Sequence, residues 1–272
     1  MTKIYYFSGT GNSLWSAKRI ARIIGEPCEL YNIGIEAEKE EIIIDAQAAV
    51  FVYPAYAYGL PLIVRRFAKK AVYKTQYLAA FVTYGSDPGG AQAALSRILK
   101  NKTSGSLYLG KIPAMENYIP FFGPPDEKKI LTRAAMQEKA TEEAARYVIE
   151  RRTNKINPFR PLSGLISFLF SLGVKIFYRH YRVSAVCNGC GVCEKICPAA
   201  AIKIKEKRPI FSGKCEHCAA CIDICPLRAI QFGRAKFNTR GYCHPQISIK
   251  ELGRLHTIAS RGKACIKQLI ML

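Results

Sequence analysis

The sequence predicts an α/β protein in which a parallel sheet, covered by helices on both faces, precedes a small cysteine-rich domain. Apolar, strand-like runs alternate with helical patterns over the first 150 residues, as they do in parallel α/β folds. Eight of the 11 cysteines lie between Cys187 and Cys225, where this alternation has ended. We expect four parts, namely an α/β domain, a basic connector, a cysteine-rich domain and a C-terminal extension: 1–152, 153–182, 183–235 and 236–272.

The strands and helices of the first part follow from the spacing of apolar residues. The predicted strands are Ile4–Phe7, Ala48–Tyr53, Tyr77–Thr83 and Ser106–Leu109. The predicted helices are Ser13–Ile24, Pro61–Lys70, Ala91–Lys100 and Asp126–Arg152. Proline suits the start of a helix, because the first N–H groups have no intrahelical acceptor. The stretch 28–44 is too irregular to assign.

An internal repeat organises the cysteines. The first copy contains Cys187, Cys190, Cys193, Cys197, Pro198 and Ile202. The same residue types recur 28 positions later as Cys215, Cys218, Cys221, Cys225, Pro226 and Ile230. Each copy reads C-x2-C-x2-C-x3-C-P, in which a tight loop brings three thiolates to one face of a 4Fe-4S cubane. Zinc needs only pairs of C-x2-C, which leaves the third and fourth cysteines unexplained. The sequence therefore predicts two 4Fe-4S clusters and one-electron transfer.

The repeat resembles bacterial two-cluster ferredoxins over residues 182–232. In those proteins the fourth cysteine of each motif ligates the other cluster. The resemblance implies a small α+β domain with one cluster on Cys187, Cys190, Cys193 and Cys225. It implies that the second cluster is bound by Cys215, Cys218, Cys221 and Cys197.

A glycine-rich turn joins the first predicted strand to the first helix. It consists of Ser8, Gly9, Thr10, Gly11, Asn12 and Ser13. Such a turn directs backbone N–H groups and hydroxyls at an anion, and the helix N-terminus adds a partial positive charge. The turn contains no lysine and no third glycine, which disfavours a nucleoside triphosphate with magnesium and a dinucleotide pyrophosphate.

This turn resembles the phosphate loop of flavodoxins, a Ser/Thr-rich stretch with a central Thr-Gly pair that holds the phosphate of FMN. The resemblance implies a flavodoxin-like, doubly wound parallel sheet of five strands in the order 2-1-3-4-5, with the flavin at the carboxyl ends of the strands. The loops after the third and fourth strands then lie where flavodoxins hold the flavin ring. The expected contacts are Pro54, Ala55, Tyr56, Tyr58, Gly59, Tyr84 and Gly85. We expect Tyr56 or Tyr58 to stack on the ring, the alternative being surface packing.

The combined layout resembles flavodoxin–ferredoxin fusion proteins, which are small electron carriers of the anaerobe type. The resemblance implies an electron-transfer protein that relays electrons between FMN, the two clusters and an external redox partner. Two alternatives stay open. The chain could be an FMN-dependent reductase of a small electrophile such as a quinone, fed through the clusters, or a docking subunit of a larger redox complex. No catalytic residue is predicted, because no Ser-His-Asp set, paired carboxylates or H-E-x-x-H motif is present.

The net charge of +21 is unevenly distributed. Residues 1–150 hold 19 basic and 15 acidic residues, a balance of +4, whereas the remaining residues hold 22 and 5, a balance of +17. A surface of this kind steers acidic partners, such as an acidic electron-transfer protein or redox enzyme, or an anionic membrane surface. We expect no nucleic acid, because no helix-turn-helix or aromatic–basic platform accompanies the charge.

The connector contains seven basic residues and no acidic residue between Arg151 and Arg182. Its uncharged run from Leu162 to Val174 has 13 residues, too few for a bilayer that needs about 20. We expect the connector to pack between the two domains; the alternative is a basic amphipathic helix lying on a membrane. The clustered thiols and the lack of a secretory signal predict a cytoplasmic protein, with peripheral membrane association as the alternative.

Several further cysteines and histidines have simpler expected roles. We expect Cys28, Cys243 and Cys265 to be buried, structural residues. His217 lies between two predicted ligands, so it could tune a cluster potential by position, but we expect a surface histidine.

Overall fold

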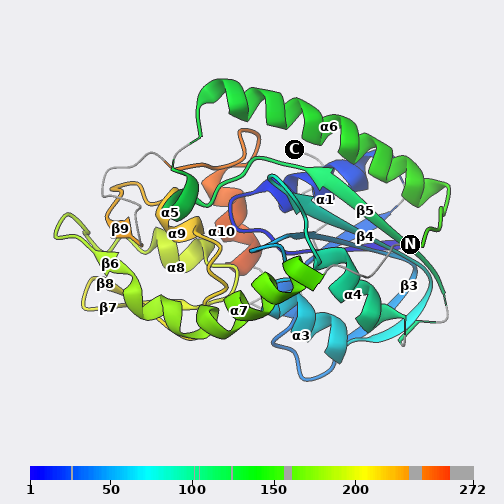
Figure 1. The fold of residues 1–272 in the computed structure, drawn as a ribbon, viewed down its shortest axis with the longest axis horizontal. Helices are drawn as coiled ribbons and strands as arrows, with labels where there is room; N and C mark the ends of the chain where they lie inside the picture. Colours follow the sequence, from blue (N-terminus) through cyan, green and yellow to red (C-terminus); the bar gives the residue numbers. More distant parts are fainter. Residues whose placement is uncertain are drawn as a thin grey trace.

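The computed structural model describes residues 1–25, 27–100, 102–103, 105–123, 125–155, 161–232 and 241–257. Its largest element is a sheet of five parallel strands in the order β2-β1-β3-β4-β5 (Figure 1). The strands are β1 (Thr2–Tyr6), β2 (Cys28–Asn32), β3 (Ile43–Pro54), β4 (Val72–Tyr84) and β5 (Ser106–Pro113). This order confirms the predicted doubly wound, flavodoxin-like sheet.

Helices cover both faces of the sheet (Figure 1). One face carries α1 (Asn12–Ile24) and α6 (Glu127–Ile149), and the other carries α3 (Leu62–Lys70) and α4 (Ala91–Leu99). The strands are buried from both sides, so their central segments are continuously apolar, as Val50, Phe51 and Val52 illustrate with no exposed surface. The side chains of a strand alternate between the two cores: Val50 packs with the α1 face and Phe51 with the α3 face.

The strands β3 and β4 begin five residues before the predicted positions. The structure shows why the apolar runs do not reveal these beginnings. The first halves of both strands alternate, with Asp45, Gln47, Lys74 and Gln76 exposed between more buried neighbours. The unassigned stretch 28–44 contains β2 and the short helix α2 (Ile33–Glu36) before β3 begins.

The second half of the chain begins with α7 (Pro161–Phe177) and a short 3-10 helix, η1 (Tyr178–His180). The cysteine-rich domain pairs β6 (Arg182–Val183) with β9 (Ile230–Gln231), and β7 (Ile202–Lys205) with β8 (Arg208–Phe211), each antiparallel. Two short helices, α8 (Val192–Ile196) and α9 (Ala220–Asp223), follow the cysteine loops. This small α+β domain matches the prediction.

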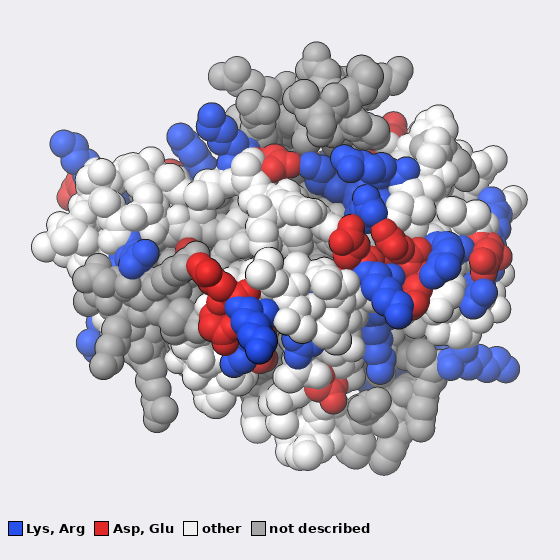
Figure 2. Space-filling view, turned by 90° about the horizontal axis from the view of Figure 1, so that it is seen from above, with Lys and Arg blue, Asp and Glu red and all other residues white. Residues whose placement is uncertain are grey.

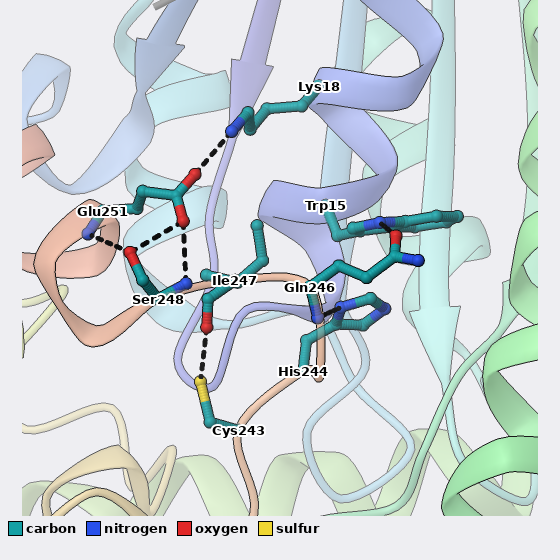
Figure 3. Close-up of polar contacts among 8 residues, drawn as sticks. All are labelled: Trp15, Lys18, Cys243, His244, Gln246, Ile247, Ser248 and Glu251. Atoms are coloured by element: carbon teal, nitrogen blue, oxygen red, sulfur yellow. Dashed lines mark hydrogen bonds and ion pairs between the residues drawn. The ribbon is translucent and has the colours of Figure 1, made fainter. Parts of the chain in front are cut away.

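The described part of the C-terminal extension, residues 241–257, folds back onto both domains. Its helix α10 (Ile249–Thr257) lies beside α8, and Glu251 at its beginning pairs with Lys18 of α1 at 2.5 Å (Figures 1 and 3). Cys265 lies outside the described residues, and so does the side chain of His256. Among the helices that the structure describes, none is long and apolar enough to cross a membrane.

Candidate cofactor site

The eight cysteines of the repeat gather into the two crossed groups that the sequence predicts. Burial raises the pKa of the Cys193 thiol to about 12, and three further thiols add to the rise: Cys225, Cys190 and Cys187. These four cysteines also line one small cavity. Burial likewise raises the pKa of Cys221 well above its usual value, and the next contributions come from Cys218, Cys215 and Cys197. The fourth cysteine of each motif therefore lies with the first three of the other motif.

This donor set fits a cubane rather than a single ion. In the described part of the chain, no three His, Cys, Asp or Glu side chains are arranged to hold one metal ion. A 4Fe-4S cubane instead takes one thiolate at each of four irons, so its sulfurs surround a cluster. Burial disfavours the thiolate form of these cysteines, so a cluster bound here would displace their protons.

The backbone follows the repeat as closely as the sequence does. Positive φ angles recur at the same offset of 28 residues, at Gly189 and His217 (73° and 57°) and at Gly191 and Ala219 (76° and 60°). Hydrogen bonds to sulfur also recur: Ala201 N donates to Cys197 Sγ at 3.2 Å, and Ala229 N donates to Cys225 Sγ at 3.3 Å. N–H···S bonds of this kind help to set cluster potentials.

His217 is the main departure from this symmetry, and the prediction of a surface histidine is wrong. His217 is 2% exposed, because its ring packs among Phe177, Tyr181 and Phe232 at centroid distances of 5.3, 5.4 and 4.3 Å. Its Nδ1 lies 3.0 Å from the Tyr118 hydroxyl. Burial lowers the pKa of the imidazole to about 4, so the ring is neutral. Histidine tolerates the left-handed region better than most residues, which allows a side chain where the first repeat has glycine.

A cavity of about 550 Å³ opens at the carboxyl ends of the strands. Its volume lies in the range that suits a cofactor-sized ligand. The lining includes all but two of the predicted ligand-contacting residues, namely Ser8, Gly9, Thr10, Asn12, Ser13, Pro54, Ala55, Tyr56, Tyr58, Tyr84 and Gly85. The cavity also reaches Cys218 and His217 of the cysteine-rich domain. It therefore connects the glycine-rich turn with the second cysteine group.

The two exceptions, Gly11 and Gly59, do not line the cavity but shape the loops behind it. Gly11 has a φ of 101° and forms the N-cap of α1, where a side chain would press on His244 and Ile247. Gly59 closes a tight turn through reciprocal backbone hydrogen bonds with Tyr56 of 2.8 and 3.0 Å. The prediction that these two glycines contact the ligand is not supported by the cavity lining.

The glycine-rich turn is already ordered by its own hydrogen bonds. Gly11 N donates to Ser8 Oγ at 3.2 Å, and Ser13 Oγ lies 2.8 Å from Thr83 Oγ1. The turn leads directly into α1, whose first N–H groups have no intrahelical acceptors. A phosphate at this position would meet neutral donors and the positive end of the helix dipole, so the residues present fit a phosphate group.

The loop after β3 presents aromatic side chains through a strained turn. Ala57 and Tyr58 both have positive φ angles, 44° and 63°, as in a two-residue type I′ turn. Such angles are unfavourable for residues other than glycine and concentrate at functional sites. Gly90 N holds the turn by donating to Tyr58 O at 2.8 Å. Tyr58 remains 40% exposed, which leaves its ring available to a ligand in the cavity.

The sequence analysis missed the loop that follows β5. Its residues Met115, Glu116, Asn117 and Tyr118 line the cavity, and Asn117 donates to Thr10 Oγ1 at 2.6 Å. The loop runs into α5 (Ile119–Phe122), whose exposed phenylalanines also line the cavity. This loop could have been predicted, because the carboxyl ends of all the parallel strands lie at the same edge of the sheet. The segment after the fifth strand is therefore expected beside the other cavity loops.

The two domains meet through direct contacts at this site. A Cβ atom on Gly9 would lie 3.1 Å from Cβ and 3.3 Å from Sγ of Cys218, so the turn packs against the second cysteine group. Glu216, which is 7% exposed, accepts hydrogen bonds from Leu62 N at 2.8 Å and Ile63 N at 2.6 Å. The carboxylate thereby caps α3, which has no side-chain cap of its own.

The C-terminal segment forms a second link (Figure 3). His244 N donates to Thr10 O at 2.8 Å, and the His244 ring stacks on Trp15 at 4.9 Å. Trp15 in turn donates to Gln246 Oε1 at 2.5 Å. Tyr242 donates through its hydroxyl to Asn12 Oδ1 at 2.7 Å and through its N–H to Asp223 of α9 at 2.9 Å. This segment therefore fastens the glycine-rich turn to the cysteine-rich domain.

The structural role predicted for Cys28 and Cys243 agrees with their surroundings, and Cys265 lies outside the described residues. Cys28 is 6% exposed within β2. Cys243 is partly buried, and its Sγ donates to Ile247 O at 3.4 Å (Figure 3).

Comparison with known proteins identifies the cysteine-rich part. Residues 186–229 match the 4Fe-4S dicluster domain family. No curated protein matches the sequence significantly.

Among solved structures, a Streptococcus pneumoniae flavodoxin is 14% identical with a TM-score of 0.34, and covers 55% of this chain and 97% of its own. A flavoprotein from Bacteroides uniformis is 14% identical with a TM-score of 0.34. The match covers 42% of this chain and 91% of the flavoprotein. An archaeal flavodoxin is 15% identical with a TM-score of 0.30. The match covers 54% of this chain and 99% of that flavodoxin. These scores are too low to carry an argument, so the fold rests on the strand order of this chain.

The cluster motifs and the matched domain make the chain an iron–sulfur protein, and the strand order places a flavodoxin-like sheet before them. In this chain a sheet with the flavodoxin strand order therefore precedes a segment that matches the 4Fe-4S dicluster domain family.

Proposed function

We propose that the chain binds one FMN and two 4Fe-4S clusters and relays electrons between them and an external redox partner. The observation that carries this proposal is the shared cavity, which is lined both by the glycine-rich turn and by Cys218, against which Gly9 of that turn packs. When bound, FMN exchanges one or two electrons, whereas each cluster transfers one. The protein contributes binding and orientation, since no acid–base residue is needed for this exchange.

Each part of the cavity has a role in holding the flavin. The turn formed by residues 8–13 receives the phosphate at the N-terminus of α1. The aromatic side chains of Tyr56, Tyr58 and Tyr84 provide faces for the ring. Tyr56 also lies near the second cysteine group, because Cys218, Cys215 and Cys197 contribute to raising its pKa after the larger effect of burial. The ring would therefore lie on the side of the cavity nearest to that group.

The two cysteine groups differ in their access to solvent, which suggests where electrons enter or leave. Cys218 and Cys221, in the second group, face the cavity and the core, whereas Cys190, in the first group, is exposed. The neighbouring hairpin β7–β8 is basic, with Lys203, Lys205, Lys207 and Arg208 exposed against a single exposed acid, Glu206. An acidic electron-transfer protein or redox enzyme would dock there by charge complementarity, and we place the protein in the cytoplasm, where its thiols stay reduced.

The relay can be tested by rapid partial reduction of the anaerobic holoprotein. We expect electrons to redistribute between flavin and clusters with a rate that is independent of protein concentration. A rate proportional to protein concentration would mean transfer between molecules and would refute the relay. Consumption of a quinone in proportion to electrons supplied would instead favour the reductase alternative.

Docking of an acidic carrier can be tested with Lys203→Gln, Lys205→Gln and Lys207→Gln combined. We expect slower electron exchange with an acidic ferredoxin at low salt, by about tenfold, and a weaker dependence on salt. The matched control is Lys128→Gln, Lys129→Gln and Lys139→Gln on α6, far along the chain from the cysteines. Equal losses in both triple variants would contradict docking at the hairpin.

A further inference from the structure

The helix α7 has its most apolar side facing outward. Six large apolar residues are each more than half exposed: Leu162, Leu165, Phe168, Leu169, Leu172 and Ile176. With 3.6 residues per turn, they occupy a sector of about 120° on one side of the helix. We call this sector the outer face of α7. A surface helix of a globular protein ordinarily has its apolar side turned inward, so this arrangement calls for a partner.

The opposite side of α7 is occupied by the protein itself. Val174 is 2% exposed, and Phe170 and Phe177 line the flavin cavity. The Oγ atom of Ser167 lies only 1.8 Å from the position that a Cβ atom on Gly59 would occupy, so α7 packs closely on this glycine. This agrees with the expected packing of the connector between the domains. It also fixes α7 in position, so the outer face cannot rotate into the core.

One basic cavity lies along the side of α7, and a second lies beyond its C-terminal end. A cavity of about 280 Å³ lies between α3, α4 and α7, and its charged lining residues are Arg65, Lys69 and Arg97. Phe168 belongs both to this cavity and to the outer face. Beyond the C-terminal end of α7, Arg179, His180 and Arg182 line a cavity of about 480 Å³. No acidic side chain is among the described residues that line either cavity.

One residue that lines the first of these cavities, Arg65, has a polar atom without a hydrogen-bond partner in the described part of the chain. The Nε atom of Arg65 is buried and has no hydrogen-bond acceptor among the described residues. Ser167 and Ser171 of α7 complete the polar wall. A phosphate group in this cavity would meet guanidinium and hydroxyl donors directly beside an exposed phenylalanine. Phosphate next to acyl chains is the chemistry of a phospholipid, and the basic residues Arg65, Lys69 and Arg97 favour an anionic one.

We propose that α7 docks the protein on the surface of an anionic lipid bilayer, with the outer face among the acyl chains and the basic cavities holding lipid phosphates. The segment from Arg151 to Arg182, which contains α7, has seven basic residues and no acidic one. A second copy of this chain is a poorer occupant, because each copy carries a net charge of +21. The face seen from above in Figure 2, which carries α6, mixes acidic and basic side chains and offers no such charge match.

Vesicle flotation with the anaerobically purified holoprotein tests this inference. We expect binding to vesicles of phosphatidylcholine with about one-third phosphatidylglycerol, and little binding to phosphatidylcholine alone. Binding should weaken as salt rises, because screening shortens the range of the charges. The proposal does not depend on the electron relay, because flotation measures membrane binding directly. The cluster absorbance of every variant is recorded separately, so a loss of clusters is distinguished from a loss of binding.

Two sets of variants separate the apolar and the charged contributions. Leu169→Gln with Leu172→Gln should weaken binding about 100-fold, at about tenfold for each leucine. The control Leu131→Gln removes a leucine of α6 that is even more exposed, and this variant should bind as the wild type does. Lys69→Gln and Arg97→Gln should each weaken binding to anionic vesicles about fivefold.

Three results would overturn the proposal. The first is no flotation with anionic vesicles at low salt, and the second is equal flotation with neutral and anionic vesicles. The third is a dimer in sedimentation velocity that Leu169→Gln and Leu172→Gln dissociate while flotation is unchanged, which would make a second copy the occupant.

Discussion

The contact between Glu216 and α3 gives a quantitative test of how the two domains are joined. Glu216 belongs to the second cysteine motif, yet its carboxylate accepts hydrogen bonds from Leu62 N and Ile63 N at 2.8 and 2.6 Å. In Glu216→Ala these two N–H groups lose their acceptor at a buried helix end. Replacing a capping side chain by alanine costs about 0.5–2 kcal/mol, and two short bonds at a buried site place this case near the upper end, at about 2 kcal/mol.

Anaerobic urea denaturation provides the assay, with the visible absorbance of the clusters and the fluorescence of the single tryptophan, Trp15, as separate probes. We expect Glu216→Ala to lower the unfolding midpoint by both probes. Glu216→Gln retains one carbonyl acceptor, so it should lose about half as much stability. The exposed Glu40→Ala serves as the control and should behave as the wild type. Midpoints of Glu216→Ala equal to those of the wild type would refute the capping role.

Three further predictions follow from the site. Cys225→Ser should reduce the iron content from about eight to about four per chain. It should spare the cluster next to the flavin, because Cys225 lies with the first cysteine group. Loss of the cluster nearest the flavin instead would contradict the crossed assignment. Tyr242→Phe leaves the buried Asn12 Oδ1 without its donor, so urea unfolding should show a loss of about 1–3 kcal/mol, and an unchanged midpoint would exclude the contact. Burial lowers the pKa of His244 to about 4, below the value near 6.5 of the unfolded chain, so the unfolded state binds more protons between these values and stability falls on acidification. Between pH 7.5 and 5.5 the wild type should lose about 1.3 kcal/mol relative to His244→Gln, and parallel losses would show that His244 is exposed or charged.

The sequence was sufficient for the features that depend on local spacing. The C-x2-C-x2-C-x3-C-P repeat predicted that the cysteines gather, while their crossed grouping was implied by the resemblance to two-cluster ferredoxins. The Ser/Thr-rich turn predicted the position of the cavity at the end of β1. Both are short segments whose geometry is set by their own glycines and prolines. The strand order followed from the resemblance to flavodoxins, and the structure confirms it.

Features that depend on contacts between distant segments could not be read from the sequence. Glu216 lies 154 and 153 positions from the two N–H groups that it caps, and Tyr242 lies 230 positions from Asn12. The burial of His217 depends on Phe177 of α7 and on Phe232, directly after β9, which no local pattern relates to it. One signal was overlooked: alignment of the two repeats places His217 opposite Gly189, which indicates a positive φ with a side chain that the fold must accommodate.

The central claim is that eight thiolates in two crossed groups adjoin a flavin cavity, and a cofactor analysis of one anaerobic preparation tests it most directly. Iron, sulfide and flavin should be determined on the same sample, with the flavin identified after release. We predict about eight irons, about eight sulfides and about one non-covalent FMN per chain. A preparation that binds zinc in place of iron, or that binds both clusters without any flavin, would contradict the account.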